Sequence, residues 1–309
     1  MTIVVFGSIN LDLVVEVPHL PVRGETVVGN RFFSATGGKA ANQAVAVAKL
    51  GVPVYSIGRV GSDNFGKVLL ENLQKAGVDT RGVTIDPDTH SGVASIVIDE
   101  YGDNAIACAA GANNLVREQE LSDFQALLPQ AKVILMELGI PLATVMEALK
   151  RAQDSNCTII LDPAPVKSKL PDEIYQMVDI ITPNEIEASQ LVGFTVDGIT
   201  TARQAAFFLH QMGAKTVIIT LGSQGAFCST GEESYWVRPI PVKAIDTVAA
   251  GDAFNGALAV ALAEGKSLKE AIQWGNVAGA LTVTKRGAQS SLPHKESFLQ
   301  LLAQQKENN

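Results

Sequence analysis

Short, almost entirely apolar segments alternate with amphipathic ones through the middle of this 309-residue chain. Apolar segments too short for a helix favour buried strands, and amphipathic segments favour helices that cover them. The alternation predicts a doubly wound, mainly parallel sheet flanked by helices, an α/β fold. The expected strands are 132–136, 158–161, 179–181 and 216–221. The expected helices are 38–50, 64–76, 141–152, 183–192, 201–212, 250–263 and 268–284.

Two segments depart from this alternation. Residues 11–33 are rich in valine, proline and glycine, and their apolar residues recur with period two. Residues 91–108 form two β-like runs around a turn at 99–104. Both predict a small β layer that leaves the α/β body. The length suits one large α/β domain, so we expect a single domain over residues 1–309.

Composition excludes several classes of protein. The chain carries 24 basic and 32 acidic residues, a net charge of −8, and no basic run longer than Lys285–Arg286, which disfavours nucleic-acid binding. No apolar stretch is long enough for a membrane span. The three cysteines, Cys108, Cys157 and Cys228, fit neither a disulfide framework nor a zinc site. We expect three buried free thiols in a reducing cytoplasm.

Two common nucleotide motifs are absent. The chain has 27 glycines but no Gly-x-Gly pair, so a dinucleotide-binding fingerprint is missing. Residues 61–68 approach a phosphate-binding P-loop, but Val68 stands where the magnesium-binding hydroxyl belongs. A turn in which Asp63 caps the following helix explains that segment better.

The strongest local signal lies between Asp246 and Gly256. Small residues precede an apolar helix, and the open amides of a helix N-terminus bind anions. Asp252 in the first turn could be only a favourable partner of the helix dipole. Because the three preceding small residues keep the amides unobstructed, we favour a general base beside a transferring phosphate.

Two further segments carry polar side chains on one face. Lys39 and Asn42 share a face of a helix opened by two glycines, which permits either close ligand approach or an ordinary solvated start. Asn10 and Asp12 share one face of an extended segment. Such an amide and carboxylate suit a vicinal diol, although a solvent-facing edge strand is an equally good explanation.

The last two segments follow strands. Thr182 and Glu185 form a capping-box pattern with a proline between them, which leaves Asn184 and Glu187 on one face. Their oxygens suit hydrated magnesium near phosphates. Residues 220–225 could wrap a nucleotide, but a plain strand and turn is the simpler explanation.

In order and spacing, these segments resemble the ribokinase-like (PfkB) family of carbohydrate kinases over almost the whole chain. The resemblance rests on residues 7–12, 37–42, 184–187, 220–225 and 246–252, and it is supported by residues 111–113, 162–165 and 287–291. The resemblance implies that ATP phosphorylates a primary hydroxyl of a free sugar. It also implies that segments 11–33 and 91–108 form a β-sheet lid that pairs two subunits in a homodimer.

The resemblance also implies residue roles. Asp252 would be the catalytic base, and Ala249, Ala250 and Gly251 would form the anion hole. The sugar would be held by Asn10, Asp12, Gly38, Lys39 and Asn42. The nucleotide would meet Thr220, Gly222, Gly225 and Asn276, with Asn184 near its phosphates and Glu187 in the Mg²⁺ shell. An activating K⁺ would use Asp246, Val248, Thr282, Lys285, Gly287 and Ser291.

One departure from the family pattern bears on the sugar. Members that phosphorylate ribose carry a sugar-contacting glutamate where this chain has Gly139, whereas Glu137 stands two residues earlier. Glu137 faces the same side of the strand but about 6–7 Å back, so it could reach the sugar only through water. We expect D-ribose as substrate, with fructose or another ketose as the alternative. A non-catalytic sugar or nucleotide sensor is a third possibility, which the retained Asp252 segment disfavours.

Overall fold

The computed structural model describes residues 1–166 and 169–307. In this part of the chain a nine-stranded sheet has the order β13-β12-β11-β10-β9-β8-β1-β4-β5. The strands are β1 (Ile3–Phe6), β4 (Val54–Gly61), β5 (Asp79–Asp86), β8 (Val133–Glu137), β9 (Thr158–Asp162), β10 (Ile180–Ile181), β11 (Thr216–Thr220), β12 (Ala226–Ser229) and β13 (Ser234–Val237). All neighbours pair in parallel except β11–β12 and β12–β13. The predicted α/β fold is confirmed.

Helices cover both faces of this sheet. Alternate residues of β1 point to opposite sides, so Ile3 and Val5 enter one core while Val4 and Phe6 enter the other. The first core is closed by α1 (Lys39–Lys49), α2 (Asn64–Lys75), α8 (Ala250–Ala263), α9 (Leu268–Thr282) and α10 (Lys295–Glu307). The second is closed by α3 (Glu118–Leu127), α4 (Leu142–Ala152), α5 (Asp172–Met177), α6 (Glu185–Val192) and α7 (Ile199–Gln211).

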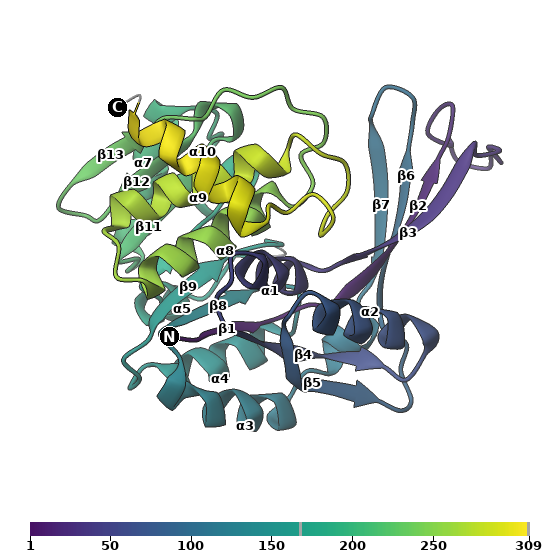
Figure 1. Ribbon diagram of the computed structural model, residues 1–309, viewed down its shortest axis with the longest axis horizontal. Coiled ribbons are helices and arrows are strands. Elements are labelled where there is room, and N and C mark those ends of the chain that lie inside the picture. Colours follow the sequence, from purple (N-terminus) through teal and green to yellow (C-terminus); the bar gives the residue numbers. More distant parts are fainter. Residues whose placement is uncertain (167–168, 308–309) are drawn as a thin grey trace.

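A separate four-stranded sheet stands beside the body in Figure 1, with the order β3-β2-β6-β7. It contains β2 (Asn10–Glu16), β3 (Arg31–Gly37), β6 (Gly92–Ile98) and β7 (Asn104–Ala109). Its strands reach beyond the expected segments 11–33 and 91–108, to Gly37 and Ala109. They do so because β3 runs directly into the glycine pair before α1, and β7 into a 3₁₀ turn, η1 (Gly111–Leu115).

Several element bounds differ from the prediction. The chain before α6 is extended, so that helix begins at Glu185 instead of residue 183, and α7 begins two residues earlier than expected. Strands β1, β4, β5, β12 and β13 were not predicted: β4 contains glycines, β5 is largely polar, and β1, β12 and β13 are each four residues long. Asp63 caps α2 as expected, accepting the Gly66 amide.

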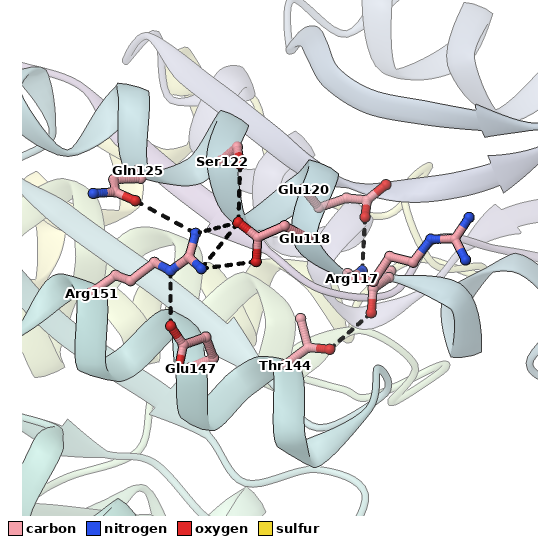
Figure 2. A network of polar contacts seen from close by, with 9 residues as sticks. Arg117, Glu118, Glu120, Ser122, Gln125, Thr144, Glu147 and Arg151 are labelled. Atoms are coloured by element: carbon pink, nitrogen blue, oxygen red, sulfur yellow. Dashed lines mark hydrogen bonds and ion pairs between the residues drawn. The ribbon is translucent and has the colours of Figure 1, made fainter.

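The helices on the second face are tied to one another, as Figure 2 shows. Arg151 of α4 bonds Glu118 of α3 at 2.9 Å and Glu147 at 3.0 Å. Thr144 Oγ1 donates a 2.8 Å hydrogen bond to the carbonyl of Val116, the residue that follows η1. These contacts tie the residue after η1 and the start of α3 to α4.

Within the described residues, no helix combines the length and the apolar character needed to cross a membrane.

Candidate active site

Several strands and helices meet at one edge of the main sheet. Strand β1 pairs with β8 on one side and with β4 on the other, so the order of connections reverses at the β1–β8 pair. Ligands of open α/β sheets bind beyond the carboxyl ends of the strands at such a point. The ends of β1, β8 and β9 and the first turns of α1 and α8 lie here.

Asp252 occupies the first turn of α8 and is 6% exposed. The preceding Ala249 has φ 60°, a left-handed conformation that is rare for a residue with a side chain. No side chain caps this helix, and a Cβ atom placed on Gly251 would meet nothing within 4 Å. The first amides of α8 therefore face open space, although the Ala250 amide also donates to the Thr247 carbonyl at 3.3 Å.

The Asp252 carboxylate is held from α1. Asn42 Nδ2 donates to its Oδ2 at 2.8 Å, and Gln43 Nε2 donates to its Oδ1 at 3.3 Å. Burial raises the pKa of Asp252, whereas Lys39 and these two hydrogen bonds oppose the rise. The arrangement orients a buried carboxylate whose affinity for a proton is increased.

A second buried carboxylate lies beside it. Asp162, the last residue of β9, accepts a 2.9 Å hydrogen bond from Gln43 and lies 3.8 Å from Lys39 Nζ. Burial raises the pKa of Asp162 to about 8, against the effect of the lysine. The Asp162 charge, in turn, raises the pKa of Lys39, which stays protonated. Lys39 and Asn42 thus reach the same centre, as their shared face predicted.

Asn10 and Asp12 lie on β2, half-buried, while the intervening Leu11 is buried. The glycines before α1 make this close approach possible. A Cβ on Gly37 would lie 2.5 Å from Asp12 Oδ2, and one on Gly38 would lie 2.7 Å from the Asn10 amide. Burial, with a smaller effect of Asp252, raises the pKa of Asp12 to about 6.

Glu137 ends β8 beneath this centre and is fully buried. One carboxylate oxygen accepts the Ser8 amide, and the other accepts the Gly139 amide at 2.7 Å. Burial raises the pKa of Glu137 despite these bonds. Each carboxylate oxygen therefore accepts a backbone amide, and Glu137 has no surface exposed to solvent.

The expected capping box at the start of α6 is wrong. Asn184, not Thr182, is the N-cap: its Oδ1 accepts the Glu187 amide at 2.8 Å, and Glu187 Oε2 accepts the Asn184 amide at 2.9 Å. Thr182 is instead buried and its hydroxyl lies 3.4 Å from the Leu161 carbonyl. Asn184 and Glu187 thus share a structural role, and Glu187 Oε1 lies outside this capping box.

The residues expected around the nucleotide gather at the end of β11. Thr220 forms a bridge with Asn184. Gly222 lies in a 3₁₀ turn, η3 (Gly222–Gln224), and Gly225 has φ 87°. A Cβ on Gly225 would lie 2.3 Å from the Val237 carbonyl, the same carbonyl that Asn276 Nδ2 approaches at 3.4 Å. The structure therefore brings Gly225 and Asn276 against one backbone segment.

Asp246 joins the two segments expected to hold a monovalent cation. Its Oδ1 accepts the Val248 amide at 3.0 Å, and its Oδ2 accepts the Gly287 amide at 2.8 Å. Thr282 and Ser291 are buried and donate their hydroxyl protons to the Ala278 and Ala288 carbonyls. Lys285 is the third residue after the end of α9, and its amide bonds the Thr282 carbonyl at 3.1 Å.

Three residues at this site were given no role by the sequence-based prediction, namely Gln43, Asp162 and Asn113, although the last two lie in segments that support the family resemblance. Asp162 could have been found as a carboxylate at a strand end, and Gln43 as the neighbour of Asn42. Among the described residues, no group of three or more His, Cys, Asp or Glu side chains is arranged to hold a metal ion. The Cys157 and Cys228 thiols are free and buried, as expected, whereas the free thiol of Cys108 is exposed, because it lies on the outer strand β7 of the small sheet.

Comparison with known proteins gives a consistent result. The family model of the pfkB family carbohydrate kinases matches residues 1–295. A ribokinase of Haemophilus influenzae is 42% identical over 97% of this chain and 98% of its own. A mouse ribokinase is 38% identical over 96% and 93%. The structure of Arabidopsis thaliana ribokinase complexed with ribose and ATP superposes with a TM-score of 0.89, at 33% identity over 97% and 98% of the two chains.

Proposed function

The chain belongs to the pfkB family of carbohydrate kinases, and from this premise we propose that it transfers the γ-phosphoryl group of ATP to a primary hydroxyl of free D-ribose, giving D-ribose 5-phosphate. The observation that carries the proposal is the Asp252 carboxylate, held by Asn42 at the uncapped start of α8. The names of full-length relatives and the bound ribose and ATP of the Arabidopsis enzyme support the choice of substrates.

In this mechanism Asp252 accepts the proton of the attacking hydroxyl. Its raised pKa makes it a better proton acceptor than an exposed aspartate, while Asn42 and Gln43 hold it in place. The hydroxyl oxygen attacks the γ-phosphorus, the bond to the β-phosphate oxygen breaks, and ADP leaves. The main-chain amides of the expected anion hole, Ala249, Ala250 and Gly251, stabilise the negative charge on the transferring group. Lys39 lies close enough for its positive charge to help stabilise the transferring group.

Mg²⁺ and K⁺ are part of the proposal. Glu187 fits the outer shell of Mg²⁺, because its Oε1 lies outside the capping box and can accept a hydrogen bond from a metal-bound water. The Mg²⁺ would offset phosphate charge. Asp246 and the segment 282–291 fit a K⁺ site, since Asp246 already links this segment to the residues before α8.

The small sheet is proposed to act as a lid on a single α/β domain, in a cytoplasmic homodimer. Its outer strand β7 exposes all of its residues, and Ile106 is 56% exposed, which supports a second subunit on this sheet. The three free cysteines support a reducing compartment. A lid would exclude water, a competing acceptor of the phosphoryl group.

A second candidate substrate is fructose or another ketose. Gly139 leaves no side chain at the position where the family resemblance implies a sugar-contacting glutamate, and the Glu137 carboxylate already accepts two backbone amides. Rates of ADP formation with ribose, 2-deoxyribose, fructose and adenosine at several concentrations test both candidates. We expect the highest kcat/KM with ribose. A higher value with fructose would assign the protein to the second candidate, and no turnover with any sugar would refute the kinase.

A further inference from the structure

Asn113, in η1 next to the start of the small sheet, contacts one of the residues expected to hold the sugar. Its side chain is 1% exposed. Its Nδ2 donates a 2.7 Å hydrogen bond to Asn10 Oδ1. A Cβ on Gly92, which pairs with Asn10 in the sheet, would lie 2.2 Å from both of these atoms. A glycine is therefore required for Asn10 and Asn113 to meet.

The orientation of the Asn113 amide is fixed by the backbone. Its Oδ1 accepts the Ile9 N–H at 2.9 Å, and its Nδ2 also lies 3.2 Å from the Ile9 carbonyl. A backbone N–H can only donate, so the oxygen of Asn113 must face Ile9 N and its NH₂ group must face Asn10. This orientation also fixes the Asn10 amide. Asn10 Oδ1 accepts the hydrogen bond from Asn113, so the NH₂ group of Asn10 remains to donate to a ligand.

Asn113 is itself held by the body of the protein. The Val116 carbonyl accepts the Thr144 hydroxyl, and Glu120 accepts the Arg117 amide at 2.8 Å (Figure 2). Glu120 is also paired with the buried Arg59 at 2.7 Å. The segment that follows Asn113 is thus tied to α3, α4 and β4, while Asn10 belongs to β2 of the small sheet.

From these contacts we infer that Asn113 is a positioning residue that determines sugar specificity: it fixes Asn10 as a hydrogen-bond donor, so the sugar must offer an acceptor there. Asp12, two residues along β2, offers a carboxylate acceptor on the same face. The donor and acceptor together suit two neighbouring hydroxyl groups, one accepting from Asn10 and one donating to Asp12. This inference rests on the proposed function and adds a residue that does not itself touch the sugar.

The test is Asn113→Asp, which keeps the shape of the side chain. One oxygen of the introduced carboxylate still accepts the Ile9 amide, but the other faces Asn10 Oδ1 and forces the Asn10 amide to turn over. Asn10 would then present its oxygen to the sugar. We expect the KM for ribose to rise about 10-fold or more at pH 8, with kcat and the KM for ATP nearly unchanged. Asn114→Asp, an identical change on the exposed neighbouring residue, is the matched control and should leave all three constants unchanged.

A pH series adds a readout that a merely structural defect would not give. When the introduced carboxylate takes up a proton, its O–H can donate to Asn10 Oδ1 and restore the original orientation. The ratio of ribose KM between Asn113→Asp and the wild type should therefore shrink as the pH falls from 8 to 6. Asp12, whose pKa is raised to about 6, and His90 beside Gly111 are present in both proteins, so the KM ratio is taken at each pH.

Two results would overturn the inference. One is a ribose KM that is unchanged in Asn113→Asp while the wild type phosphorylates ribose. The other is a raised KM whose ratio stays constant with pH and is matched by an equal loss of kcat, which would indicate general damage. If Asn113→Asp does not fold, Asn113→Ala in the Asn10→Ala background replaces it, and a further rise in ribose KM there contradicts the inference. Absence of sugar phosphorylation by the wild type would instead refute the proposed function.

Discussion

Asn42 donates a 2.8 Å hydrogen bond to Asp252 and so joins the first turns of two helices that are 210 residues apart in the sequence. Helices α1 and α8 pack against each other along the same core, so this bond is supported by apolar contacts on both sides. The carboxylate is buried, its pKa is raised by that burial, and its donors limit the rise. The protonation of Asp252 is therefore set by the packing of α1 on α8.

Replacing Asn42 by leucine should shift the acidic limb of the kcat profile to higher pH. The bond to Asn42 favours the charged form of Asp252, so its loss should raise the pKa of Asp252 further. The kcat at saturating sugar and ATP, measured from pH 4.5 to 9, reports this shift. Gln43→Leu should give a smaller shift, because its bond to Asp252 is longer. Identical kcat profiles for wild type and Asn42→Leu would show that protonation of Asp252 does not cause the acidic limb.

Asp162→Asn should reduce the pH dependence of stability. Burial raises the pKa of Asp162 to about 8, so between about pH 4 and 8 the folded protein keeps a proton that the unfolded chain has lost. The wild type therefore loses stability as the pH rises through this range, with a slope of up to about 1.4 kcal/mol per pH unit from this group. Urea unfolding at pH 5, 6, 7 and 8 should show a shallower slope in the variant. Asp154→Asn, at an exposed position, is the control. If stability falls with pH as steeply in Asp162→Asn as in Asp154→Asn, the prediction is contradicted.

Potassium should raise kcat relative to sodium or a bulky organic cation at constant ionic strength. Asp246 links the residues before α8 to the segment 282–291, so a cation bound there would stabilise the turn that presents the open amides. Initial rates in the three salts at saturating substrates measure the effect, and Asp246→Asn should remove most of it. Equal rates in all three salts would exclude a cation site at this position.

Gly139→Ala should destabilise the protein. A Cβ atom there would lie 2.6 Å from both Glu137 Oε2 and Ser8 Oγ, and the buried Glu137 carboxylate would have to leave its backbone partners. Overpacking of this kind costs about 1–3 kcal/mol of unfolding free energy, measurable by urea denaturation. Gly279→Ala in α9 is the control, since its nearest neighbour would be at 3.5 Å. A variant as stable as the control would show that Glu137 moves freely, and would reopen position 139 to a glutamate.

The parts of this site that lie on one segment could be predicted from the sequence. The two-residue period of a strand predicts that Asn10 and Asp12 share one face. The period of a helix predicts the same for Lys39 and Asn42. The contacts of Gln43 and Asp162 could not, because they depend on where β9 ends relative to α1. The capping box of α6 was misplaced by two residues, since an extended chain before Asn184 and a helix beginning at Pro183 fit the same sequence. Asn113 carried no local signal of its partner 103 residues away.

The most direct test of the proposed chemistry is the product formed from ribose and ATP, followed by ³¹P NMR with wild type and Asp252→Asn. The wild type should give ADP and D-ribose 5-phosphate in equal amounts. Asp252→Asn should still bind ribose, because the amide keeps the shape of the side chain, but its kcat should fall by roughly 10²-fold or more. Near-native kcat in Asp252→Asn, or a phosphate on another hydroxyl, would contradict the assignment of Asp252 as the base for the primary hydroxyl.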